Sequence, residues 1–354
     1  MNEPLVSVVV PVYKIKEEYL RNCIDRLLDQ GRSDYRIILV DDGSPDNCGA
    51  ICDEYAQKCD FVTAVHQENQ GAAAARNTGI AQVKTTWLTF VDADDWVEKD
   101  YMDTIYSYIT GDASDADVLM YDYVREYSAS KSEESINAMT GYLPKDTLDL
   151  CKKSVFFHYI DNEKRNPYTC VALWSKVYRV DFLKRNNIHF VPEARKGQDR
   201  LFNAEALTLA PNIFYVHKQL YHYRCFEESR TNRYDADVPN LVTIELRNLQ
   251  KLIEKYALKD TAGDFFNCYV STRIYSCMRL CYFHSSNPSP YKDRVKGLKD
   301  LVGSEPYRSA LKNVNMGLLS PEEKVFVYCI KLKLYRICSL LVRARSSRTR
   351  KKLG

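Results

Sequence analysis

The sequence predicts an α/β protein with a mostly parallel central sheet and a helical region at its carboxyl end. The first observation is that residues 6–12 and 37–40 are runs rich in β-branched and aliphatic residues, as in strands buried on both faces. The second is that residues 17–28, between these runs, have the apolar spacing of an amphipathic helix. The third is that the pattern becomes helical from residue 240 onward. A strand, a helix and a strand in this order predict a right-handed crossover between parallel strands.

The alternation of helices and strands continues along the chain. The expected elements are a helix over residues 50–58, a strand over 61–65, a helix over 72–83, a strand over 87–91 and, later, a strand over 117–127. We expect the polar residues 128–137 to form an exposed loop. Together these elements extend the parallel sheet through further crossovers.

Length and composition bound the class of protein. A chain of 354 residues that is 45% hydrophobic is long enough for one large domain or two, with an ordinary core. Its 50 basic and 47 acidic side chains give a net charge of +3, so no overall field indicates a polyanion as partner, and nucleic-acid binding is not expected. No export-type leader precedes the first strand, so the twelve cysteines are expected to be reduced thiols in the cytoplasm.

An aromatic ring and five carboxylates stand at the points where three of the expected strands end. The first strand ends at Pro11-Val12-Tyr13, the second at Asp41-Asp42-Gly43-Ser44 and the fourth at Asp92-Ala93-Asp94-Asp95. Because the carboxyl ends of parallel strands meet at one edge of a sheet, these residues are expected to line one crevice. A single acidic turn is ordinarily a helix cap. Two such turns on neighbouring strands repel each other unless a cation or hydrogen bonds compensate, and they therefore indicate a binding site.

Several segments, taken in order, resemble the motifs of the family-2 glycosyltransferases, a group of enzymes with the GT-A fold. The matching segments are Pro11-Val12-Tyr13, Val40-Asp41-Asp42-Gly43-Ser44, Asn69-Gln70-Gly71 through Ala75-Arg76-Asn77, Asp92-Ala93-Asp94-Asp95 and Gly197-Gln198-Asp199. The resemblance covers about residues 6–230. It implies a Rossmann-like sheet flanked by helices, in an enzyme that moves a sugar from a nucleotide-sugar donor to an acceptor.

The resemblance implies that the donor is bound by residues at three strand ends and by one arginine: Pro11, Val12, Tyr13, Asp41, Asp42, Arg76, Asp92 and Ala93. Tyr13 is expected to pack against the nucleobase, usually uracil, and Asp42 to accept a hydrogen bond from it. Asp92 is expected near the ribose. Arg76 is expected to contact the donor or to pair with one of the aspartates. Asp41 could instead hydrogen-bond its own loop, and Tyr13 could simply cap its strand.

The resemblance also implies a divalent cation as cofactor. Asp92-Ala93-Asp94 is similar to the D-x-D motif of the family, in which the residue at the position of Asp94 ligates an ion that bridges the donor diphosphate. Mg²⁺ and Mn²⁺ prefer oxygen ligands and take one or two carboxylates together with phosphate oxygens and water. Such an ion acts as a Lewis acid on the departing nucleoside diphosphate. Asp95 is expected to support the loop, and a solvated acidic turn is the alternative.

The acceptor side of the site is expected in the second half of the same domain. Asp199 is the candidate general base, because a sugar hydroxyl is a weak nucleophile and needs a carboxylate within hydrogen-bond reach of its proton. The resemblance implies acceptor contacts from Trp174, Lys176 and Gln198, the last at a position where family members usually carry Glu. Trp174 could stack on a sugar or pack in the core. Asp199 could instead cap a helix over residues 200–209.

The segment Tyr221-His222-Tyr223-Arg224 resembles the strand that closes the donor site in the family. Some relatives carry His or Arg two residues after this arginine, where this chain has Phe226. Arg224 and Arg230 are therefore the candidates for a cation that holds the donor phosphates. His222 is expected to point away from the site.

The expected domain organisation has three parts. Residues 1–235 form the GT-A domain, with a nucleotide-sugar half at 1–127 and an acceptor half at 128–235, followed by a helical region at 236–318 and an amphipathic helix with a basic tail at 319–354. Within the helical region we expect helices over residues 241–256, 264–283 and 291–301.

The last part begins with a helix-start signal. Ser320-Pro321-Glu322-Glu323 has the form of a capping box with proline at the first helical position. A single apolar stripe is expected after it, with basic residues broadly opposite: Val327, Ile330, Leu334, Ile337 and Leu341 against Lys333, Arg336 and Arg343. Such a helix with a polybasic end is expected to lie at an anionic membrane surface without spanning the bilayer. The alternative is a helix packed on the protein with a disordered cationic tail.

These expectations favour an inverting, metal-dependent hexosyl- or N-acetylhexosaminyl-transferase of surface-polysaccharide biosynthesis. It would move a sugar from a UDP-linked or other nucleotide-sugar donor to a glycan or polyprenyl-diphosphate-linked acceptor, at the inner face of the cell membrane. A dehydrogenase is excluded because the turn at Val12-Tyr13-Lys14 has no G-x-G-x-x-G. The alternative from another class is a nucleotide-sugar-binding protein that keeps this fold and has lost turnover.

Overall fold

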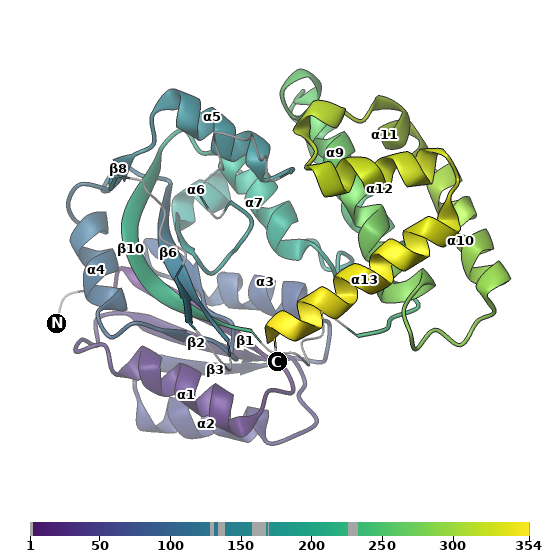
Figure 1. The fold of residues 1–354 in the computed structure, drawn as a ribbon. Helices are drawn as coiled ribbons and strands as arrows, with labels where there is room; N and C mark the ends of the chain where they lie inside the picture. The colour runs from purple at the N-terminus through teal and green to yellow at the C-terminus, as the bar shows by residue number, and fades with distance from the viewer. Residues whose placement is uncertain are drawn as a thin grey trace. The chain divides into compact units, whose positions relative to one another are not determined.

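A computed structural model of the chain describes residues 3–127, 131–133, 139–157, 168, 170–225 and 233–353, with side chains described for all of these except 131–133 and 346–353. The chain forms two compact units, drawn in Figure 1. Unit 1 comprises Met1–Asp149 and Pro167–Arg224, and unit 2 comprises Leu150–Asn166 and Cys225–Gly354. The division after Arg224 falls earlier in the chain than the expected boundary at residue 235, and the segment 150–166 groups with unit 2.

Unit 1 is built on one mixed sheet, which confirms the predicted α/β class. Across the sheet the strands are β3 (Val62–His66), β2 (Arg36–Asp41), β1 (Val6–Val12), β4 (Trp87–Phe90), β9 (Lys176–Arg179), β6 (Val118–Glu126), β10 (Ile213–Arg224) and β5 (Trp96–Val97), while β7 (Lys131–Glu133) pairs with β6 and β8 (Gly141–Tyr142) with β10. Strands β1, β2, β3, β4, β6 and β10 run in one direction, and the other described strands run against them. The sheet is therefore mostly parallel, as predicted, although β7 lies where only a loop was expected.

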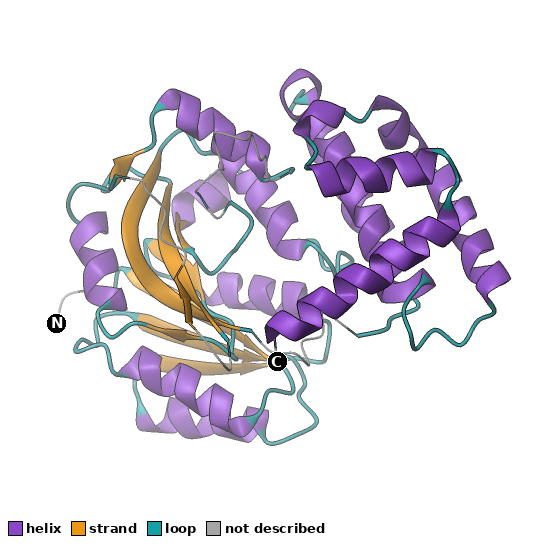
Figure 2. Cartoon of the chain, viewed as in Figure 1, coloured by secondary structure: helices purple, strands orange, loops and turns teal. Residues whose placement is uncertain are grey.

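Helices cover both faces of this sheet (Figures 1 and 2). They are α1 (Glu17–Leu28), α2 (Cys48–Lys58), α3 (Ala72–Gln82), α4 (Tyr101–Ile109), α6 (Val180–Arg185) and α7 (Gln198–Leu209), and α5 (Lys145–Ser154) straddles the division between the units. Side chains of β1 alternate between the two faces. Val8 and Val10 join a core with Leu20 of α1 and Ile51 of α2, whereas Val9 faces α3. The strands of unit 1 are therefore buried on both faces, as their hydrophobic runs predict.

Helix α3 approaches the sheet closely because it carries a glycine at the contact. A Cβ atom added at Gly79 would lie 2.4 Å from Cγ1 of Val9 and 3.3 Å from Cγ2 of Val40. Protein interiors are close-packed, and real side chains do not approach to 2.4 Å. The glycine therefore sets the distance between α3 and the strands, and with it the place of Arg76 on the same helix.

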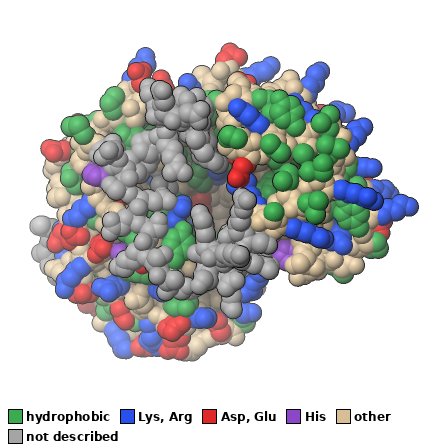
Figure 3. All heavy atoms as spheres, in the orientation of Figure 1, with side chains coloured by type: hydrophobic (Ala, Val, Ile, Leu, Met, Phe, Trp, Pro, Cys, Tyr) green, Lys and Arg blue, Asp and Glu red, His purple; other side chains and the backbone are tan. Residues whose placement is uncertain are grey.

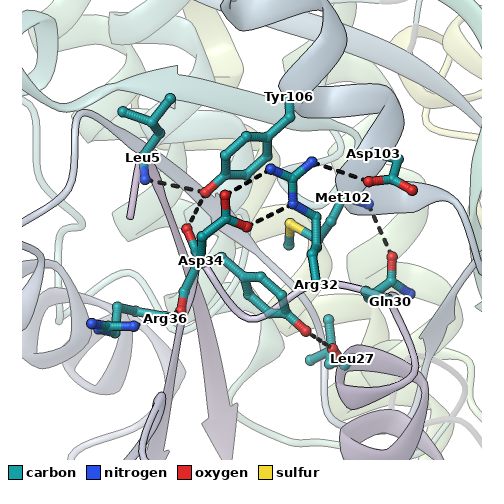
Figure 4. A network of polar contacts seen from close by, with 10 residues as sticks. Leu5, Leu27, Gln30, Arg32, Asp34, Arg36, Met102, Asp103 and Tyr106 are labelled. Carbon is teal, nitrogen blue, oxygen red and sulfur yellow. Dashed lines mark hydrogen bonds and ion pairs between the residues drawn. The ribbon is translucent and has the colours of Figure 1, made fainter. Parts of the chain in front are cut away.

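A polar network ties α4 to the starts of β1 and β2, at the end of the strands opposite to the predicted site (Figure 4). Arg32 donates to both carboxylate oxygens of Asp34, at 2.7 and 2.8 Å, and to Asp103 of α4 at 3.0 Å. The Arg32 guanidinium lies 3.6 Å from the ring centroid of Tyr106, whose hydroxyl accepts the Leu5 N–H and donates to the Asp34 carbonyl. Because a bidentate arginine–carboxylate pair is geometrically specific, this network fixes the amino-terminal edge of the sheet.

Unit 2 is helical in the residues that the structure describes. Its main elements are α8 (Val238–Lys255), α9 (Lys259–Cys277), a π-helical turn at Met278–Tyr282, α10 (Tyr291–Gly303), α11 (Tyr307–Asn313), a 3₁₀ turn at Met316–Leu318, α12 (Pro321–Lys331) and α13 (Tyr335–Leu353). Between α8 and α9, the fully buried Glu245 accepts hydrogen bonds from Tyr269 and, at 2.7 Å, from Arg273. A buried carboxylate is tolerated there because both a cation and a hydroxyl compensate its charge.

The carboxyl-terminal segment was predicted as one continuous helix, and this prediction is wrong. Its start is as expected: the Ser320 hydroxyl accepts the Glu323 N–H, and the Glu323 carboxylate accepts the Ser320 N–H. Helix α12 then ends at Lys331. Lys333 adopts a left-handed backbone with a φ of 58°, and α13 begins at Tyr335.

The break changes which side chains pack in unit 2. Val327 and Ile330 of the expected stripe are buried, but Leu334 and Ile337 are exposed. The buried side of α13 is formed by other residues: Tyr335, Cys338 and Val342. No helix in the described part of the chain is both long and apolar enough to cross a membrane.

Candidate active site

The carboxyl ends of β1, β2 and β4 lie side by side, as the motif pattern predicts. Parallel pairing places Val12 of β1 beside Asp41 of β2, and β4 pairs with the other edge of β1. The Asp42 N–H continues this pattern by donating to the Val12 carbonyl at 2.9 Å. The residues that follow the strands, among them Tyr13, Asp42 and Asp92, therefore share one edge of the sheet.

A buried arginine joins two of the predicted carboxylates. Arg76 of α3 donates from Nη2 to Asp92 Oδ1 at 2.8 Å and from Nη1 to Asp199 Oδ1 at 3.1 Å. The Arg76 side chain is 5% exposed, whereas those of Asp92 and Asp199 are 26% and 30% exposed. The buried Arg76 Nε has no hydrogen-bond partner within the described structure. Of the two roles expected for Arg76, pairing with an aspartate is present, and two aspartates share the cation.

Asp199 lies in the first turn of α7. Gly197, with a φ of 70°, is the cap of this helix, so Asp199 is not the cap that the alternative interpretation required. Burial raises the pKa of the Asp199 carboxyl above its usual value; the Arg76 charge opposes this effect and the Asp92 charge adds to it. A carboxylate with a raised pKa is the better proton acceptor near neutral pH. The geometry therefore suits Asp199 to the role of general base.

The carboxylate of Asp42 is hydrogen-bonded to the loop that leads into α3. It is almost fully buried, and its carboxylate accepts hydrogen bonds from the side chains of Gln67 and Asn69 and from the backbone N–H groups of Gln70 and Gly71, at 2.7 to 3.1 Å. This structural role was not expected from the sequence. The hydrogen bond from a nucleobase to Asp42 stays a prediction.

The carboxylate of Asp41 is hydrogen-bonded to the loop that follows β2. Its Oδ1 accepts the Ser44 N–H at 3.1 Å, and its Oδ2 lies 3.1 Å from His66 Nδ1. His66 also lies 2.9 Å from Asp53, and hydrogen bonds to Asp53 and Asp41 raise the pKa of the imidazole. Asp41 therefore hydrogen-bonds its own loop, which was the alternative to a donor contact.

The acidic loop 92–95 is held by two residues of β10. The Tyr221 hydroxyl accepts the Asp92 N–H at 3.1 Å and donates to Asp95 Oδ2 at 2.7 Å. Arg224 donates its backbone N–H to Asp95 Oδ1 at 2.7 Å and its Nε to the Asp94 carbonyl at 2.8 Å. Asp95 is buried, and burial together with the charges of Asp94 and Asp92 raises the pKa of its carboxyl well above the usual value. Asp95 thus supports the loop, as the motif implies.

The same loop offers oxygen ligands that fit a divalent cation. Asp94 is half-buried and Asp92 partly exposed, whereas Asp95 is committed to Tyr221 and Arg224. Within the described residues, no group of three or more His, Cys, Asp and Glu side chains is placed to hold a metal. A cation at Asp94 would therefore share ligands with phosphate and water, a set that Mg²⁺ and Mn²⁺ accept. It would also compensate the mutual repulsion of the carboxylates.

Arg224 is fixed in a stack of rings. Its guanidinium lies 4.4 Å from the ring centroids of both Tyr19 and Trp96. Trp96 in turn stacks on His222, with ring centroids 5.0 Å apart. These contacts make Arg224 a support of the acidic loop, whereas a clamp on the donor phosphates was expected. The other clamp candidate, Arg230, lies outside the described residues.

A polar pocket that the motifs did not indicate adjoins this stack. His222 and Tyr221 point to opposite faces of β10, because successive side chains of a strand alternate. The two ring nitrogens of His222 lie 2.7 Å from Glu98 and from Glu126. The pocket has a volume of about 440 Å³ and is lined by Asn22, Arg26, Trp96, Val97, Glu98, Glu126, His222 and Arg224.

The structure buries Trp174, for which stacking on a sugar was one of two expectations. Its side chain is 7% exposed and stacks on Tyr221 and Tyr223, with ring centroids 4.5 and 5.4 Å away. Tyr123 meets the same indole edge to face at 4.7 Å. The assignment of Trp174 to the acceptor is therefore corrected to a core residue.

Lys176 and Gln198, the other two acceptor candidates, differ in accessibility. Lys176 is fully buried and donates from Nζ to the Ala172 carbonyl at 2.5 Å, so its assignment to the acceptor is also corrected. Its charge lowers the pKa of Asp199. Gln198 lies next to Asp199 with a buried Oε1 that has no hydrogen-bond partner among the described residues. Gln198 therefore stays an acceptor candidate.

The remaining donor candidates divide between the core and the crevice. The side chains of Val12 and Ala93 are buried in the core, so any contact from them to a ligand would come from the backbone. Pro11 and Tyr13 are half-buried at the end of β1 and stay candidates. Tyr221 anchors the acidic loop through its hydroxyl, a role that its place in the segment Tyr221-His222-Tyr223-Arg224 did not predict.

The chain is similar to several known proteins. A family model described as glycosyl transferase family 2 matches residues 7–185. Glycosyltransferase GlyA of Streptococcus pneumoniae is 31% identical over 221 residues, which are 62% of this chain and 30% of GlyA. The uncharacterized glycosyltransferase EpsJ of Bacillus subtilis is 28% identical over 341 residues, with 92% of each chain covered. The chain thus spans less than a third of GlyA but most of EpsJ.

A solved structure has a similar fold. TarS residues 1–349 of Staphylococcus aureus, in complex with UDP-GlcNAc, matches with a TM-score of 0.64, covering 97% of this chain and 92% of that one at 18% identity. At this identity the likeness concerns the fold alone. The GT-A fold implied by the motifs is confirmed.

Proposed function

We propose, since this chain belongs to glycosyl transferase family 2, that it is a metal-dependent, inverting glycosyltransferase acting on a UDP-linked sugar and a glycan acceptor in polysaccharide biosynthesis. The observation that carries the proposal is the Arg76 bridge between Asp92 and Asp199. Asp92 belongs to the loop that would hold the donor, and Asp199 is the carboxylate that would act on the acceptor. One buried cation therefore couples the two halves of a transfer site.

On the donor side, we assign Tyr13 to the nucleobase and Asp92 to the ribose. The orphaned Nε of Arg76 supports an anionic ligand nearby, because buried donors ordinarily have an acceptor. A UDP-linked donor is supported by TarS, whose name is poly(ribitol-phosphate) β-N-acetylglucosaminyltransferase and whose structure holds UDP-GlcNAc. When bound at Asp94, Mg²⁺ or Mn²⁺ would supply Lewis acidity at the donor diphosphate.

On the acceptor side, we assign Asp199 to the proton of the attacking hydroxyl. As the oxygen of the acceptor bonds to the anomeric carbon, the Asp199 carboxylate takes the proton, and the bond to the nucleoside diphosphate breaks on the opposite face. Arg76 positions Asp199 and opposes the effect of burial on its pKa. Gln198, with its unpartnered Oε1, would orient a donor group of the acceptor.

The acceptor is proposed to be a glycan linked to a polyprenyl diphosphate, and the protein is proposed to be peripheral on the cytoplasmic face of the membrane. The basic carboxyl-terminal segment supports this location, because anionic lipid headgroups attract clustered Lys and Arg side chains. A lipid-linked acceptor would be presented at the same surface.

The test measures donor binding and turnover separately. Thermal shifts of the full chain are recorded with UDP-, GDP- and CMP-linked sugars, with and without Mn²⁺, and release of nucleoside diphosphate is followed in parallel. We expect a UDP-sugar to stabilise the protein in the presence of Mn²⁺. We expect Asp199→Asn to keep this shift and to lower UDP release by about a thousandfold, since general bases contribute on the order of 10²–10⁴.

The matched control is Asp181→Asn. Asp181 is the second residue of α6, as Asp199 is of α7, but it is exposed. Its replacement should leave both readouts unchanged. Unchanged UDP release by Asp199→Asn would remove the proposed base. A wild-type protein that binds UDP-sugars but releases no UDP with any acceptor would support the binding-protein alternative.

A further inference from the structure

The last two helices of unit 2 expose apolar side chains that its core does not use. Within the described residues, six of the nine exposed large hydrophobic side chains lie on α12, on α13 and on the link between them. We call this set the apolar ridge; its members, each 40 to 66% exposed, are Val325, Tyr328, Leu332, Leu334, Ile337 and Leu340. Figure 3 shows hydrophobic side chains gathered over α12, with Lys and Arg side chains beside them.

The ridge is distinct from the packed sides of the same helices. Val325 and Tyr328 of α12 and Leu332, which directly follows it, recur at helical spacing, so they lie on one side. The intervening residues Phe326, Val327, Cys329 and Ile330 are buried in unit 2. On α13, Ile337 and Leu340 are likewise exposed beside buried neighbours. A helix that is apolar on a second, exposed side indicates an interaction surface.

Basic side chains predominate around the ridge, although Glu322 and Glu323 stand in the first turn of α12 and Glu322 lies 3.8 Å from Arg345. Residues 324–354 carry ten basic side chains and no acidic one, whereas the rest of the chain has 40 basic and 47 acidic side chains. Lys331, Lys333 and Arg336 alternate with ridge residues along the chain and are exposed. The positive charge of this protein is therefore concentrated where its exposed apolar surface is.

We propose that α12 and α13 form a membrane-docking surface in which the apolar ridge enters the headgroup region of an anionic bilayer while the neighbouring cations contact lipid phosphates. The inference deepens the part of the proposed function that locates the protein at a membrane, and it names the surface that makes the contact. Helices with an apolar side and a cationic side lie in the plane of the interface. The two helices suit this mode, since in the described part of the chain neither is both long and apolar enough to span the bilayer.

Other occupants fit the same surface less well. A second copy of the chain would bring two segments of ten cations together, and like charges oppose such a contact. Nucleic acid would satisfy the cations but would leave the Leu, Ile and Val side chains without an apolar environment. An anionic bilayer supplies both the charge and the apolar layer.

The test uses flotation of the full chain with vesicles of phosphatidylcholine, alone or with about a third phosphatidylglycerol. We expect binding to the anionic vesicles and weaker binding to the neutral ones. The triple substitution Leu332→Ser, Ile337→Ser and Leu340→Ser should lower the partition coefficient at least about tenfold, because three exposed apolar side chains no longer enter the membrane. Met139→Ser, which removes an exposed apolar side chain of unit 1, is the control and should have no effect.

The cations are tested with a second pair of variants. Lys331→Gln, Lys333→Gln and Arg336→Gln together should weaken binding to anionic vesicles by at least about tenfold, and raised salt should have the same effect. The matched control replaces Lys292, Lys296 and Lys312, exposed cations elsewhere in unit 2, by Gln. Equal losses from both triples would overturn the assignment to α12 and α13, because net charge alone would explain them.

Insertion and folding are read out separately. In Leu332→Trp, the tryptophan emission should shift to shorter wavelength on addition of anionic vesicles, whereas in Met139→Trp it should not. Circular dichroism melts verify that each variant is folded. Unchanged vesicle binding by the ridge variant, or a ridge variant that only dissociates a dimer, would overturn the proposal. UDP release in the absence of lipid should be the same in ridge variants and wild type, so failure of docking and failure of the proposed catalysis are distinguishable.

Discussion

The guanidinium of Arg76 in α3 lies 3.1 Å from the carboxylate of Asp199 in α7. Its positive charge opposes the rise in the pKa of Asp199 that burial causes. The same guanidinium holds Asp92 at 2.8 Å. Because Arg76 is almost fully buried, its planar fork fixes both carboxylates at once. The orientation of the proposed base is thereby coupled to the acidic loop on the donor side.

This coupling predicts a pH dependence of transfer. The pKa of Asp199 is raised above the usual 3.8, so the carboxyl is protonated, and inactive as a base, at pH values where an exposed aspartate is already ionised. Activity should therefore rise with pH through this raised pKa. The measurement is kcat/KM for the donor between about pH 4.5 and 8, at saturating Mn²⁺. An acid limb no higher than that of an ordinary aspartate would contradict the environment described for Asp199.

Replacing Arg76 by a neutral residue should move the acid limb of the pH profile to higher pH. In Arg76→Gln, Asp199 keeps the effects of burial and of Asp92 but loses the opposing cation, so its pKa should rise further. Misplacement of two carboxylates should also lower kcat/KM at pH 7 by about a hundredfold. The readout that separates the charge effect from lost structure is the position of the acid limb.

The control for this variant is Arg21→Gln. Arg21 also bridges two carboxylates, those of Glu17 and Glu54, but on the surface between α1 and α2. Its replacement should leave the pH profile in place. An acid limb that shifts in neither variant, with activity lost only in Arg76→Gln, would reduce Arg76 to a structural role.

Local patterns were enough to predict most elements of unit 1 and the start of α12 in unit 2. The run at Val6–Val12, the amphipathic stretch at Glu17–Leu28 and the capping box at Ser320 carry their structural signal within a few residues, and each is present. The carboxylates at the ends of β2 and β4 could be assigned to one edge because parallel strands bring their carboxyl ends together.

What the sequence could not supply depends on contacts between distant segments. Its position after a strand predicts an accessible carboxylate for Asp42, but the loop 67–71 folds over this residue and donates hydrogen bonds to the carboxylate. Trp174 is equally compatible with a sugar and with a core until Tyr221 and Tyr223 are seen to stack on it. The break at Lys333 was missed because the apolar spacing continues through it and no glycine or proline marks it.

Arg224 should act through the acidic loop. Its Nε holds the Asp94 carbonyl, and its guanidinium lies over the rings of Tyr19 and Trp96. Arg224→Lys keeps the charge but loses both the Nε donor and the planar group. We expect the apparent KM for Mn²⁺ to rise about tenfold, with a smaller change in the KM for the donor, since a displaced Asp94 would bind the cation less well.

The comparison variant is Arg26→Lys, in the same pocket as Arg224 but on α1. It should leave the dependence on Mn²⁺ unchanged. If Arg224 instead clamps the donor phosphates, Arg224→Lys should raise the KM for the donor at every Mn²⁺ concentration and leave the apparent KM for Mn²⁺ as it is. Kinetics at several concentrations of both ligands distinguish these two outcomes.

The close packing of α3 against the sheet predicts that adding a single methyl group at Gly79 lowers the stability of the protein. In an ordinary helix, replacement of glycine by alanine stabilises the fold by about 1 kcal/mol. At Gly79 the new methyl group would lie 2.4 Å from Val9 Cγ1, so α3 must shift or Val9 must move. We expect Gly79→Ala to lower the free energy of unfolding by about 1 to 3 kcal/mol, the usual effect of overpacking a core.

A second substitution that removes the clash with Val9 tests whether this clash causes the loss of stability. Val9→Ala removes both methyl groups that the new Cβ would meet at 2.4 and 3.1 Å, so the double variant should be more stable than the sum of the two single effects predicts. Gly263→Ala on α9, where the nearest atom is 3.9 Å away, should be neutral or stabilising. Because α3 also carries Arg76, Gly79→Ala should lower UDP release along with stability, whereas Gly263→Ala should not. Urea unfolding followed by circular dichroism measures the stabilities, and additive effects of Gly79→Ala and Val9→Ala would contradict a direct clash.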